Sequence, residues 1–551
     1  MTKNQSIDSL IQKYFLWVFF FMLAFALLSH LDHLPLKFEE PRRGVVAMEM
    51  EYSGNYIAPT INGEYYYNKP PIYNWLLVFL FKIFNSKEDW VLRVPTVLSF
   101  VLLAFVNFQV NRRKLGDKVA LLSSLLFLTS TDLLFYFSFQ GEIDMFYSLI
   151  VYLQITSILL FFEKKNYRSL FIFSYLLVSI GVLTKGIPSI AFQAITLLAF
   201  FIYHKRFKEL FSFWHFIGFG LFILIVGGYF YLYSEYNDPL LYITRLFTES
   251  SSRTIVQKSF IDSIFHLFTF PLILLDILAP WLLIAPLFIT MSIISKVKES
   301  KWLSLIILFF ISNILLYWIS PGARDRYLYM FVPFATTLFA FIIYKHSQEN
   351  VAIPKFANAL LLFVMLTLIL VLPVLPFIPP VSTVKNVALI VSLLFILLGL
   401  LLFIYSRSKV SKIQVFILFI VAARIGFNYI VMPLRLEDEL RDNFKYHVNE
   451  ILELVQNDTF FYYGEIEHSE KKAPFLQQTI SYDELAYYPY QLTYYIEKNR
   501  KAVFAYSMKR STKAFYLSEK NNFDVISGKK EILYEFNLGK REFDFVLFKF
   551  I

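Results

Sequence analysis

The chain has 551 residues, of which 57% are hydrophobic and 17% are charged, and its 52 basic and 42 acidic residues give a formal net charge of +10. This hydrophobic content, arranged in repeated apolar runs of about twenty residues, excludes an ordinary soluble domain and indicates a polytopic membrane protein. Because the chain has no cysteine, disulfides and thiolate metal sites are also excluded. Most basic residues lie in short connections between apolar runs, so the positive charge reflects membrane topology rather than nucleic-acid binding.

The N-terminal part consists of one apolar run and a long polar loop. Residues 14–31 form the run, which is too long for a signal peptide and has no small-residue cleavage site, so we expect an uncleaved span. A first extracytoplasmic loop with juxtamembrane helices is expected over 32–89. Within it, Ile72–Phe84 is apolar but short and follows two prolines, which favours a helix lying at the membrane surface.

The middle of the chain contains further apolar runs separated by short charged connections. Together with the first run they predict about thirteen transmembrane helices. The run at 263–297 is too long for one straight helix, and Pro271 and Pro280 are expected to break it. The other expected spans are 90–110, 119–137, 143–162, 168–183, 187–203, 212–233, 302–319, 327–345, 356–376, 386–405 and 413–433.

Basic residues are abundant in every second connection between these spans and scarce in the others. Connections rich in Lys and Arg face the cytoplasm in most membrane proteins. The N-terminus is therefore expected inside the cell, and the 32–89 loop and everything after Met432 outside. The rich connections carry Arg112, Arg113, Lys114, Lys118, Lys164, Lys165, Arg168, Lys205, Arg206, Lys208, Lys296, Lys298, Lys301, Lys345, Lys355, Arg407, Lys409 and Lys412.

The composition changes after Pro433 from apolar to charged and aromatic. Residues 436–455 have the apolar spacing of a helix, and 459–463, 502–506, 531–536 and 543–549 resemble strands. We therefore expect a transmembrane domain over 1–433 and a small extracytoplasmic α/β domain over 434–551. No catalytic motif is recognised in the second domain, and its expected role is to cover the site or to contact the acceptor.

The 32–89 loop combines acids, bases and turn formers, and long loops between packed elements are often functional. A carboxylate such as Glu39 or Glu40 can remove a proton from an attacking hydroxyl group. A lysine such as Lys69 can neutralise a phosphate leaving group. The alternative is a solvated loop whose charges have no chemical role.

The order of residues in this loop resembles the first extracytoplasmic loop of GT-C glycosyltransferases that use polyprenyl-phosphate sugars. The aminoarabinose transferases of lipid A and the related protein mannosyltransferase-like proteins are the branch that it resembles. The matching segments are Glu39-Glu40-Pro41-Arg42, Glu49-Met50, Ser53-Gly54-Asn55-Tyr56, Pro59, Gly63 and Tyr66-Tyr67-Asn68-Lys69-Pro70-Pro71.

The resemblance implies a set of site residues. Glu39, Glu40 and Asp144 would be the catalytic acids, and it stays open which of the first two is the base, because Glu39 stands where the family has aspartate. As an alternative, Asp144 is an ordinary helix cap and the cations are interfacial anchors. The donor phosphate would be bound by Lys69, Lys185, Arg324 and Arg326, and further pocket residues would be Arg42, Tyr66, Glu142, Glu249, Arg253 and Tyr327.

The family positions best suited to bind a metal are changed in this chain. Asn68 stands in place of a glutamate and Ser250 in place of a histidine. Amide and hydroxyl groups are poor zinc ligands, so we expect that no metal cofactor is required. Arg424, near the middle of the last span, should face the protein interior, in an ion pair or a donor contact, since a lipid-exposed arginine costs about 2.5–3.5 kcal/mol on insertion scales.

The expected function is that of a membrane glycosyltransferase. It would move a sugar from a polyprenyl-phosphate donor, such as an undecaprenyl-phosphate sugar, to lipid A or another glycolipid, with inversion at the anomeric carbon. The expected location is the bacterial cytoplasmic (inner) membrane, with the active site and the C-terminal domain in the periplasm. Two alternatives remain: a protein O-glycosyltransferase acting on Ser or Thr, and a lipid or solute transporter, although the chain lacks the repeat that transporters usually contain.

Overall fold

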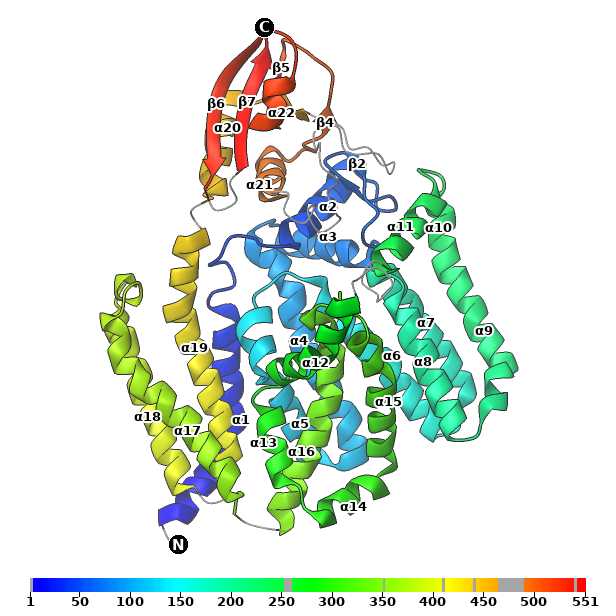
Figure 1. The fold of residues 1–551 in the computed structure, drawn as a ribbon, viewed down its shortest axis with the longest axis vertical. Coiled ribbons are helices and arrows are strands. Elements are labelled where there is room, and N and C mark those ends of the chain that lie inside the picture. Colours follow the sequence, from blue (N-terminus) through cyan, green and yellow to red (C-terminus); the bar gives the residue numbers. More distant parts are fainter. Residues whose placement is uncertain are drawn as a thin grey trace. The chain divides into compact units, whose positions relative to one another are not determined.

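The structure is a computed structural model that describes residues 3–251, 260–349, 352–408, 412–439, 442–463, 490–539 and 543–551 (Figure 1). The chain divides into two compact units. The helical unit comprises Met1–Leu31, Val94–Tyr231 and Leu240–Leu434, and the mixed unit comprises Asp32–Arg93, Leu232–Pro239 and Arg435–Ile551. The first loop, which the sequence assigns to the membrane domain, thus forms one unit with the C-terminal segment.

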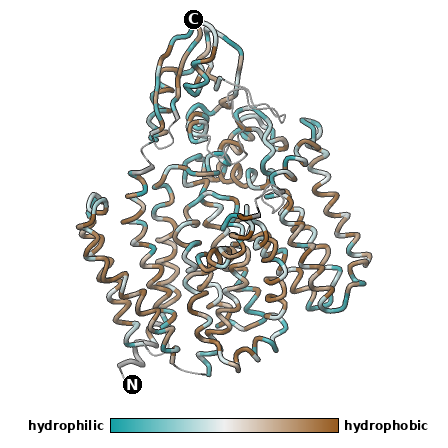
Figure 2. Tube along the Cα trace, in the orientation of Figure 1, coloured by the Kyte–Doolittle hydropathy of each residue, from teal (hydrophilic) through white to brown (hydrophobic). Residues whose placement is uncertain are grey.

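The helical unit consists of long apolar helices, coloured brown along most of their length in Figure 2. Nine helices among the described residues are long and apolar enough to cross a membrane, and a bent pair at 261–288 would add a tenth. The chain is therefore a multi-pass membrane protein with an α-helical fold, as expected. The nine helices are Asp89–Leu115 (α4), Ile143–Glu163 (α6), Tyr167–Lys185 (α7), Phe213–Tyr233 (α9, η3 and α10), Lys301–Trp318 (α15), Asp325–Glu349 (η6 and α16), Lys355–Phe377 (α17 and η7), Val387–Arg407 (α18) and Lys412–Glu437 within α19.

Some of the expected spans are shorter or more broken than the sequence suggests. The 119–137 run begins as α5 (Asp117–Leu128) and continues, after a break, as the π-helical turn η1 (Leu133–Phe137). At the break the Thr129 hydroxyl donates to the Leu125 carbonyl at 2.7 Å, and such side-chain bonds compete with regular helix pairing. Two other expected spans are short apolar helices: Gln12–Leu28, within α1 (Lys3–Leu28), and α8 (Pro188–Tyr203).

The long 263–297 run is broken, but at one of the two expected prolines. Pro271 lies inside α12 (Phe260–Ile277), so the expected break there is wrong. The chain bends by 101° at Pro280, between α12 and the segment Trp281–Phe288. The remaining elements of this unit are η2 (Phe207–Phe211), α11 (Pro239–Ser251), α13 (Trp281–Ile284), η5 (Ala285–Phe288), α14 (Met291–Glu299) and η8 (Val381–Thr383).

Buried polar side chains join the helices of this unit. The Tyr152 hydroxyl of α6 donates to Asn107 Oδ1 of α4 at 2.7 Å, and Asn111 Nδ2 of α4 donates to Thr337 Oγ1 of α16 at 2.9 Å. Arg424, on α19, is 1% exposed and donates from Nε to the Leu134 carbonyl at 2.7 Å. It therefore faces the protein interior, where polar groups require partners.

The mixed unit contains a five-stranded sheet with helices beside it (Figure 1). The strand order is β4-β3-β5-β7-β6, in which β3 pairs in parallel with β4 and β5, and β7 pairs antiparallel with β5 and β6. The expected α/β character of this segment is thus observed. Its elements are α2 (Glu40–Ser53), β1 (Thr60–Ile61), β2 (Glu64–Tyr65), α3 (Ile72–Phe84), α20 (Phe444–Val455), β3 (Thr459–Tyr463), α21 (Tyr490–Arg500), β4 (Tyr506–Ser507), β5 (Ala514–Glu519), α22 (Lys520–Val525), β6 (Lys530–Leu538) and β7 (Phe543–Phe550).

Three expectations for the C-terminal segment need correction. The strand expected over 502–506 is replaced by the two-residue strand β4 (Tyr506–Ser507). The helix expected over 436–455 is divided, because α19 ends at Glu439 and α20 begins only at Phe444, after Asn443 with a φ of 39°. Strand β5 (Ala514–Glu519) was not predicted, although it lies in the middle of the sheet between β3 and β7. Its side chains are buried on both faces, so the alternation of polar and apolar residues that marks a half-exposed strand is absent.

Candidate active site

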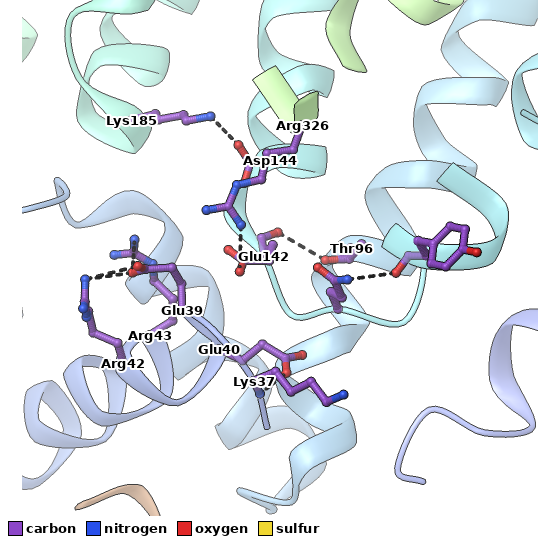
Figure 3. A network of polar contacts seen from close by, with 12 residues as sticks. Lys37, Glu39, Glu40, Arg42, Arg43, Thr96, Glu142, Asp144, Lys185 and Arg326 are labelled. Carbon is purple, nitrogen blue, oxygen red and sulfur yellow. Dashed lines mark hydrogen bonds and ion pairs between the residues drawn. The ribbon is translucent and has the colours of Figure 1, made fainter. Parts of the chain in front are cut away.

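Helix α2 carries the first acid of the predicted site at its N-terminus. Glu39 is the N-cap residue, and its carboxylate accepts from Arg42 at 3.0 Å and from Arg43 at 3.5 Å (Figure 3). Both arginines lie one turn further along α2, which is the spacing at which side chains on a helix meet. The Glu39 side chain is 15% exposed. It is therefore a carboxylate that two cations hold in place without removing it from solvent.

The neighbouring acid, Glu40, has a different environment. Arg93 of α4 donates to its two oxygens at 2.9 and 3.2 Å, and the Lys37 amide donates at 2.7 Å. The Glu40 and Arg93 side chains are each 2% exposed. Since these bonds occupy its oxygens in a buried position, Glu40 connects α2 to α4 and is poorly placed to accept a proton from a substrate.

The other predicted residues of the first loop lie in the same unit. Tyr66 is buried, and its hydroxyl accepts from Arg43 Nη1 at 2.6 Å. Arg42 lies over the Tyr490 ring, 4.8 Å from its centroid. Lys69 is half-buried and donates from Nζ to the Asn68 carbonyl at 3.0 Å. The two arginines that pair with Glu39 therefore each contact a tyrosine ring or hydroxyl.

A second cluster of charges lies in the helical unit, around the start of α6. Asp144, in the first turn of α6, is 1% exposed and is paired with Lys185, the last residue of α7. Arg326 lies 3.4 Å from Asp144 Oδ2 and 2.9 Å from Glu142 Oε1. Figure 3 shows both cations directed toward these acids. The four charges therefore form one network drawn from three separate segments of the chain.

Aromatic rings complete the surroundings of Lys185. Its Nζ lies 4.1 Å from the centroid of the Tyr327 ring and 5.0 Å from that of the Tyr147 ring. Ring faces attract a cation most strongly where water is scarce. The Lys185 side chain is 10% exposed and that of Arg326 17%, against 2% for Asp144. The cations are thus the more accessible members of the network.

Local backbone structure positions this cluster. Gly186, with a φ of 89°, ends α7 directly after Lys185, a conformation that favours glycine. The Glu142 carbonyl accepts from the Thr96 hydroxyl at 3.2 Å, which attaches the segment before α6 to α4. Arg326 lies in η6 (Asp325–Phe331), beyond an extended Arg324.

The remaining predicted residues lie after α6, in and around α11 and before η6. Arg324 is exposed, and Glu249 is half-buried on α11. Ser250 donates to the Leu246 carbonyl at 2.9 Å. Arg253 lies outside the described residues. Within the part of the chain that the structure describes, no three His, Cys, Asp or Glu side chains are grouped to hold a metal ion.

Three residues of these clusters were not among the predicted site residues. Arg43 and Tyr147 follow Glu39 and Asp144 at helical spacing, so a search of the same helix face would have found them. Arg93 gives no such signal, because its partner Glu40 lies 53 residues away in the chain. A buried ion pair of this kind becomes visible only in the fold.

Parts of the chain match a family model and known proteins. The family model described as dolichyl-phosphate-mannose-protein mannosyltransferase matches residues 68–229. A protein of Aquifex aeolicus described as uncharacterized is 29% identical over 191 residues, which are 34% of this chain and 37% of that protein. An undecaprenyl phosphate-alpha-4-amino-4-deoxy-L-arabinose arabinosyl transferase of Edwardsiella ictaluri is 28% identical over 186 residues, 32% of each chain. The chain thus matches about a third of the length of these curated relatives.

The fold is similar over nearly the whole chain. The crystal structure of ArnT from Cupriavidus metallidurans bound to undecaprenyl phosphate matches with a TM-score of 0.66 and 14% identity, and covers 97% of each chain. The chain therefore has the fold of that protein, with its membrane helices and its C-terminal sheet. The resemblance to GT-C glycosyltransferases of the aminoarabinose-transferase and protein-mannosyltransferase type is confirmed by these matches.

Proposed function

We propose that this chain is a membrane glycosyltransferase that moves a sugar from a polyprenyl-phosphate donor to an acceptor hydroxyl group. The observation that carries the proposal is the network in which Lys185 and Arg326 meet around Asp144 and Glu142. Two partly accessible cations fixed at the ends of apolar helices suit a phosphate whose lipid tail lies in the bilayer. The sequence and fold relatives named above support the same chemistry.

Lys185 and Arg326 bind the donor phosphate in this proposal. Each is now paired with a carboxylate, which fixes its position before the donor arrives. As the bond between the anomeric carbon and the phosphate oxygen breaks, the bonding electrons remain on the oxygen, and the two cations stabilise the charge that develops there. Lys69, from the mixed unit, and Arg324 are further phosphate ligands in the proposal.

Glu39 acts as the base. Its carboxylate is partly exposed and is held by Arg42 and Arg43, whereas Glu40 is buried against Arg93. Glu39 takes the proton of the acceptor hydroxyl while that oxygen forms its bond to the anomeric carbon. Asp144, held between two cations, orients them and assists on the donor side. Attack on the face opposite the departing phosphate inverts the anomeric centre.

The acceptor is a glycolipid in the favoured version of the proposal. The Edwardsiella ictaluri relative is described as an aminoarabinose transferase, and the fold match is to ArnT. A protein acceptor with Ser or Thr hydroxyls is the second candidate, because the matching family model is that of protein mannosyltransferases. Reaction on the outer face of the cytoplasmic membrane, without a required metal, completes the proposal, and the distribution of Lys and Arg between connections supports that orientation.

Donor turnover by the purified full-length chain tests the proposal. We expect release of polyprenyl phosphate from an undecaprenyl-phosphate sugar only when an acceptor such as lipid A is supplied. Glu39→Gln and Lys185→Met should each reduce that release. Glu453→Gln, which changes an exposed carboxyl on α20, is the control and should retain full turnover.

Three outcomes would contradict the proposal. One is release without any acceptor, which would indicate a hydrolase. Another is undiminished turnover in the Glu39→Gln and Lys185→Met variants, which would place the chemistry elsewhere. The third is transfer to exported peptides but not to lipid A, which would replace the glycolipid by the protein acceptor. Mass spectrometry of lipid A and of periplasmic glycopeptides from a deletion strain separates the two acceptors.

A further inference from the structure

Two carboxyl groups meet in the interior of the mixed unit, away from the acids of the candidate site. Glu49 lies on α2 and Glu497 on α21, both side chains are fully buried, and the charges of the two groups interact. Among the described residues no donor reaches Glu497 Oε2. Within the described residues neither of them forms an ion pair. Two ionised carboxylates this close in the interior repel each other strongly, whereas a proton on one of them would let it donate to the other, so we expect one of the two to be neutral.

The other partners of the pair are neutral donors. Glu49 Oε2 accepts from the Thr60 hydroxyl at 2.5 Å and from the Gly63 amide at 3.2 Å. Glu497 Oε1 accepts from the Phe504 amide at 2.9 Å. These donors satisfy one negative charge, but two uncompensated charges in contact inside a protein are prohibitively unfavourable. The pair is therefore built to hold a single proton.

Burial raises the pKa of Glu49 to about 7. The pKa of Glu497 is also raised well above its ordinary value, by burial first and by the charge of Glu49 second. Because the two groups titrate together, the values belong to the pair. The proton is consequently retained at neutral pH, where an exposed glutamate would have lost it.

The pair fastens α2, the helix that begins at Glu39, to α21. The approach of the two helices is close: a Cβ atom at Gly44 would lie 2.3 Å from Cε2 of the buried Tyr494 ring. The Tyr52 hydroxyl donates to the Glu497 carbonyl at 3.2 Å. Helix α21 thus contacts α2 from its first turn, where Arg42 lies over the Tyr490 ring, to its last.

Several other ionisable groups lie on the segments that surround the pair. On α2, Glu51 is paired with Lys87 at 2.8 Å, and burial raises the pKa of Tyr52, with the charges of Glu497 and Glu51 adding to it. On α21, Lys498 is paired with Glu88 at 2.6 Å. The β1–β2 hairpin contributes the half-buried Glu64, and the segment after α21 contributes the exposed Lys501.

We propose that Glu49 and Glu497 are positioning residues that share one proton, and that this proton holds α2 against α21 and so keeps Glu39 in place for the reaction. The catalytic part of this inference rests on the proposed function, and the proton-sharing part does not. Loss of the proton places two charges in contact, which pushes α21 away from α2. Helix α21 of the C-terminal segment is then a functional part of the transferase.

The sign of the pH effect follows from the raised pKa values. The folded chain holds a proton that the unfolded chain releases near the ordinary glutamate pKa of 4.5, so the stabilisation is complete below that pH. It is lost as the pH rises through about 7. Other groups add to the same trend, because burial also raises the pKa of Asp32 and of Glu519. A variant that removes the shared proton is therefore needed to isolate the pair.

Glu497→Gln in the full-length chain provides that variant, since a glutamine amide donates the hydrogen bond without titrating. We expect the Tm of the wild type to fall between pH 5 and pH 8.5 by on the order of 5 °C more than that of Glu497→Gln. Glu453→Gln, with its exposed carboxyl, should follow the wild type. If Glu497→Gln does not fold, Glu49→Gln serves in its place, because either amide can donate to the remaining carboxylate.

Transferase activity provides the second measurement. Above the apparent pKa of the pair the wild-type kcat/KM should fall about tenfold per pH unit, while that of Glu497→Gln stays within about twofold. Parallel Tm curves for the wild type and both glutamine variants would overturn the shared proton. A flattened Tm curve with an unchanged activity profile would overturn the positioning role. A chain with no transferase activity would refute the proposed function, and the Tm curves would still decide whether the proton is shared.

Discussion

One pair of buried acids in each unit shows how differently a buried carboxyl group can be neutralised. In the helical unit, Asp144 and Glu142 are balanced by Lys185 and Arg326, so cations carry the compensation. In the mixed unit, the hydrogen-bond donors to Glu49 and Glu497 among the described residues are neutral, and in our proposal a shared proton provides the compensation. Cation pairing keeps a carboxylate ionised over a wide pH range, whereas a shared proton is lost on titration. We therefore assign the donor chemistry to the ion-paired network and the pH dependence to the Glu49–Glu497 pair.

The adjacent residues Glu39 and Glu40 are both paired with arginines but differ in exposure. Glu39 is partly exposed and Glu40 is buried against Arg93. We expect Glu39→Gln to have the largest effect on catalysis, a fall in kcat of about 10²–10⁴-fold, because the acceptor loses its base. Donor release assays measure this effect, and an unchanged Tm would separate it from misfolding. A loss smaller than tenfold would move the base to another residue.

Glu40→Gln should instead act on stability. The change leaves the buried Arg93 guanidinium without its counter-charge, which costs up to about 3–5 kcal/mol. Chemical denaturation followed by a probe in the mixed unit measures the loss. Glu51→Gln is the matched control, because its pair with Lys87 is more exposed and should contribute less than about 1 kcal/mol. Equal losses in both variants would mean that burial does not distinguish the two pairs.

Lys185→Met tests the cation side of the comparison. Removal of one charge at the phosphate should lower kcat by about 10²–10³-fold, and the loss of the ion pair between Lys185 and Asp144 should also destabilise the helical unit. The double variant Lys185→Met with Asp144→Asn removes both charges. It should recover stability without recovering turnover, and recovery of turnover would show that Lys185 only balances Asp144.

Gly44→Ala should give the smallest effect. Its new methyl group meets the Tyr494 ring and Leu92 Cδ2, at 2.3 Å and 2.8 Å, so overpacking should cost about 1–3 kcal/mol. Gly399→Ala, in α18, is the control, because no atom lies within 4 Å of the added carbon. Thermal unfolding of the two variants measures the difference, and equal Tm values would contradict the close contact between α2 and α21.

The sequence predicts local features well and long-range pairs poorly. Apolar runs and basic connections predict a multi-pass helical fold, and the first-loop motif predicts Glu39, Lys69 and Tyr66 as site candidates. The roles of Glu40 and Glu49 depend on Arg93 and Glu497, which lie far away in the chain, and no local pattern indicates such partners. For the same reason, grouping of the first loop with the C-terminal segment emerges only from the fold.

Short-range side-chain chemistry limits the prediction of helix ends in the same way. The 119–137 run breaks at Thr129, and the hydrogen bond from the Thr129 hydroxyl to the Leu125 carbonyl is a feature that hydrophobicity does not register. Pro271 lies within a continuous helix, while Pro280 coincides with a bend of 101°. Proline alone therefore does not predict a break, because the surrounding helix can accommodate it.

The central claim is that Glu39 and Asp144 serve one reaction, Glu39 on the acceptor hydroxyl and Asp144 on the donor side. Because the chain contains no cysteine, Glu39→Cys and Asp144→Cys can be introduced together and treated with a short bifunctional thiol reagent. The pair Asp144→Cys and Lys185→Cys, whose native side chains are in contact, is the positive control. The account predicts an intramolecular cross-link in both double variants, reduced by bound undecaprenyl phosphate. A cross-link in the control alone would contradict it.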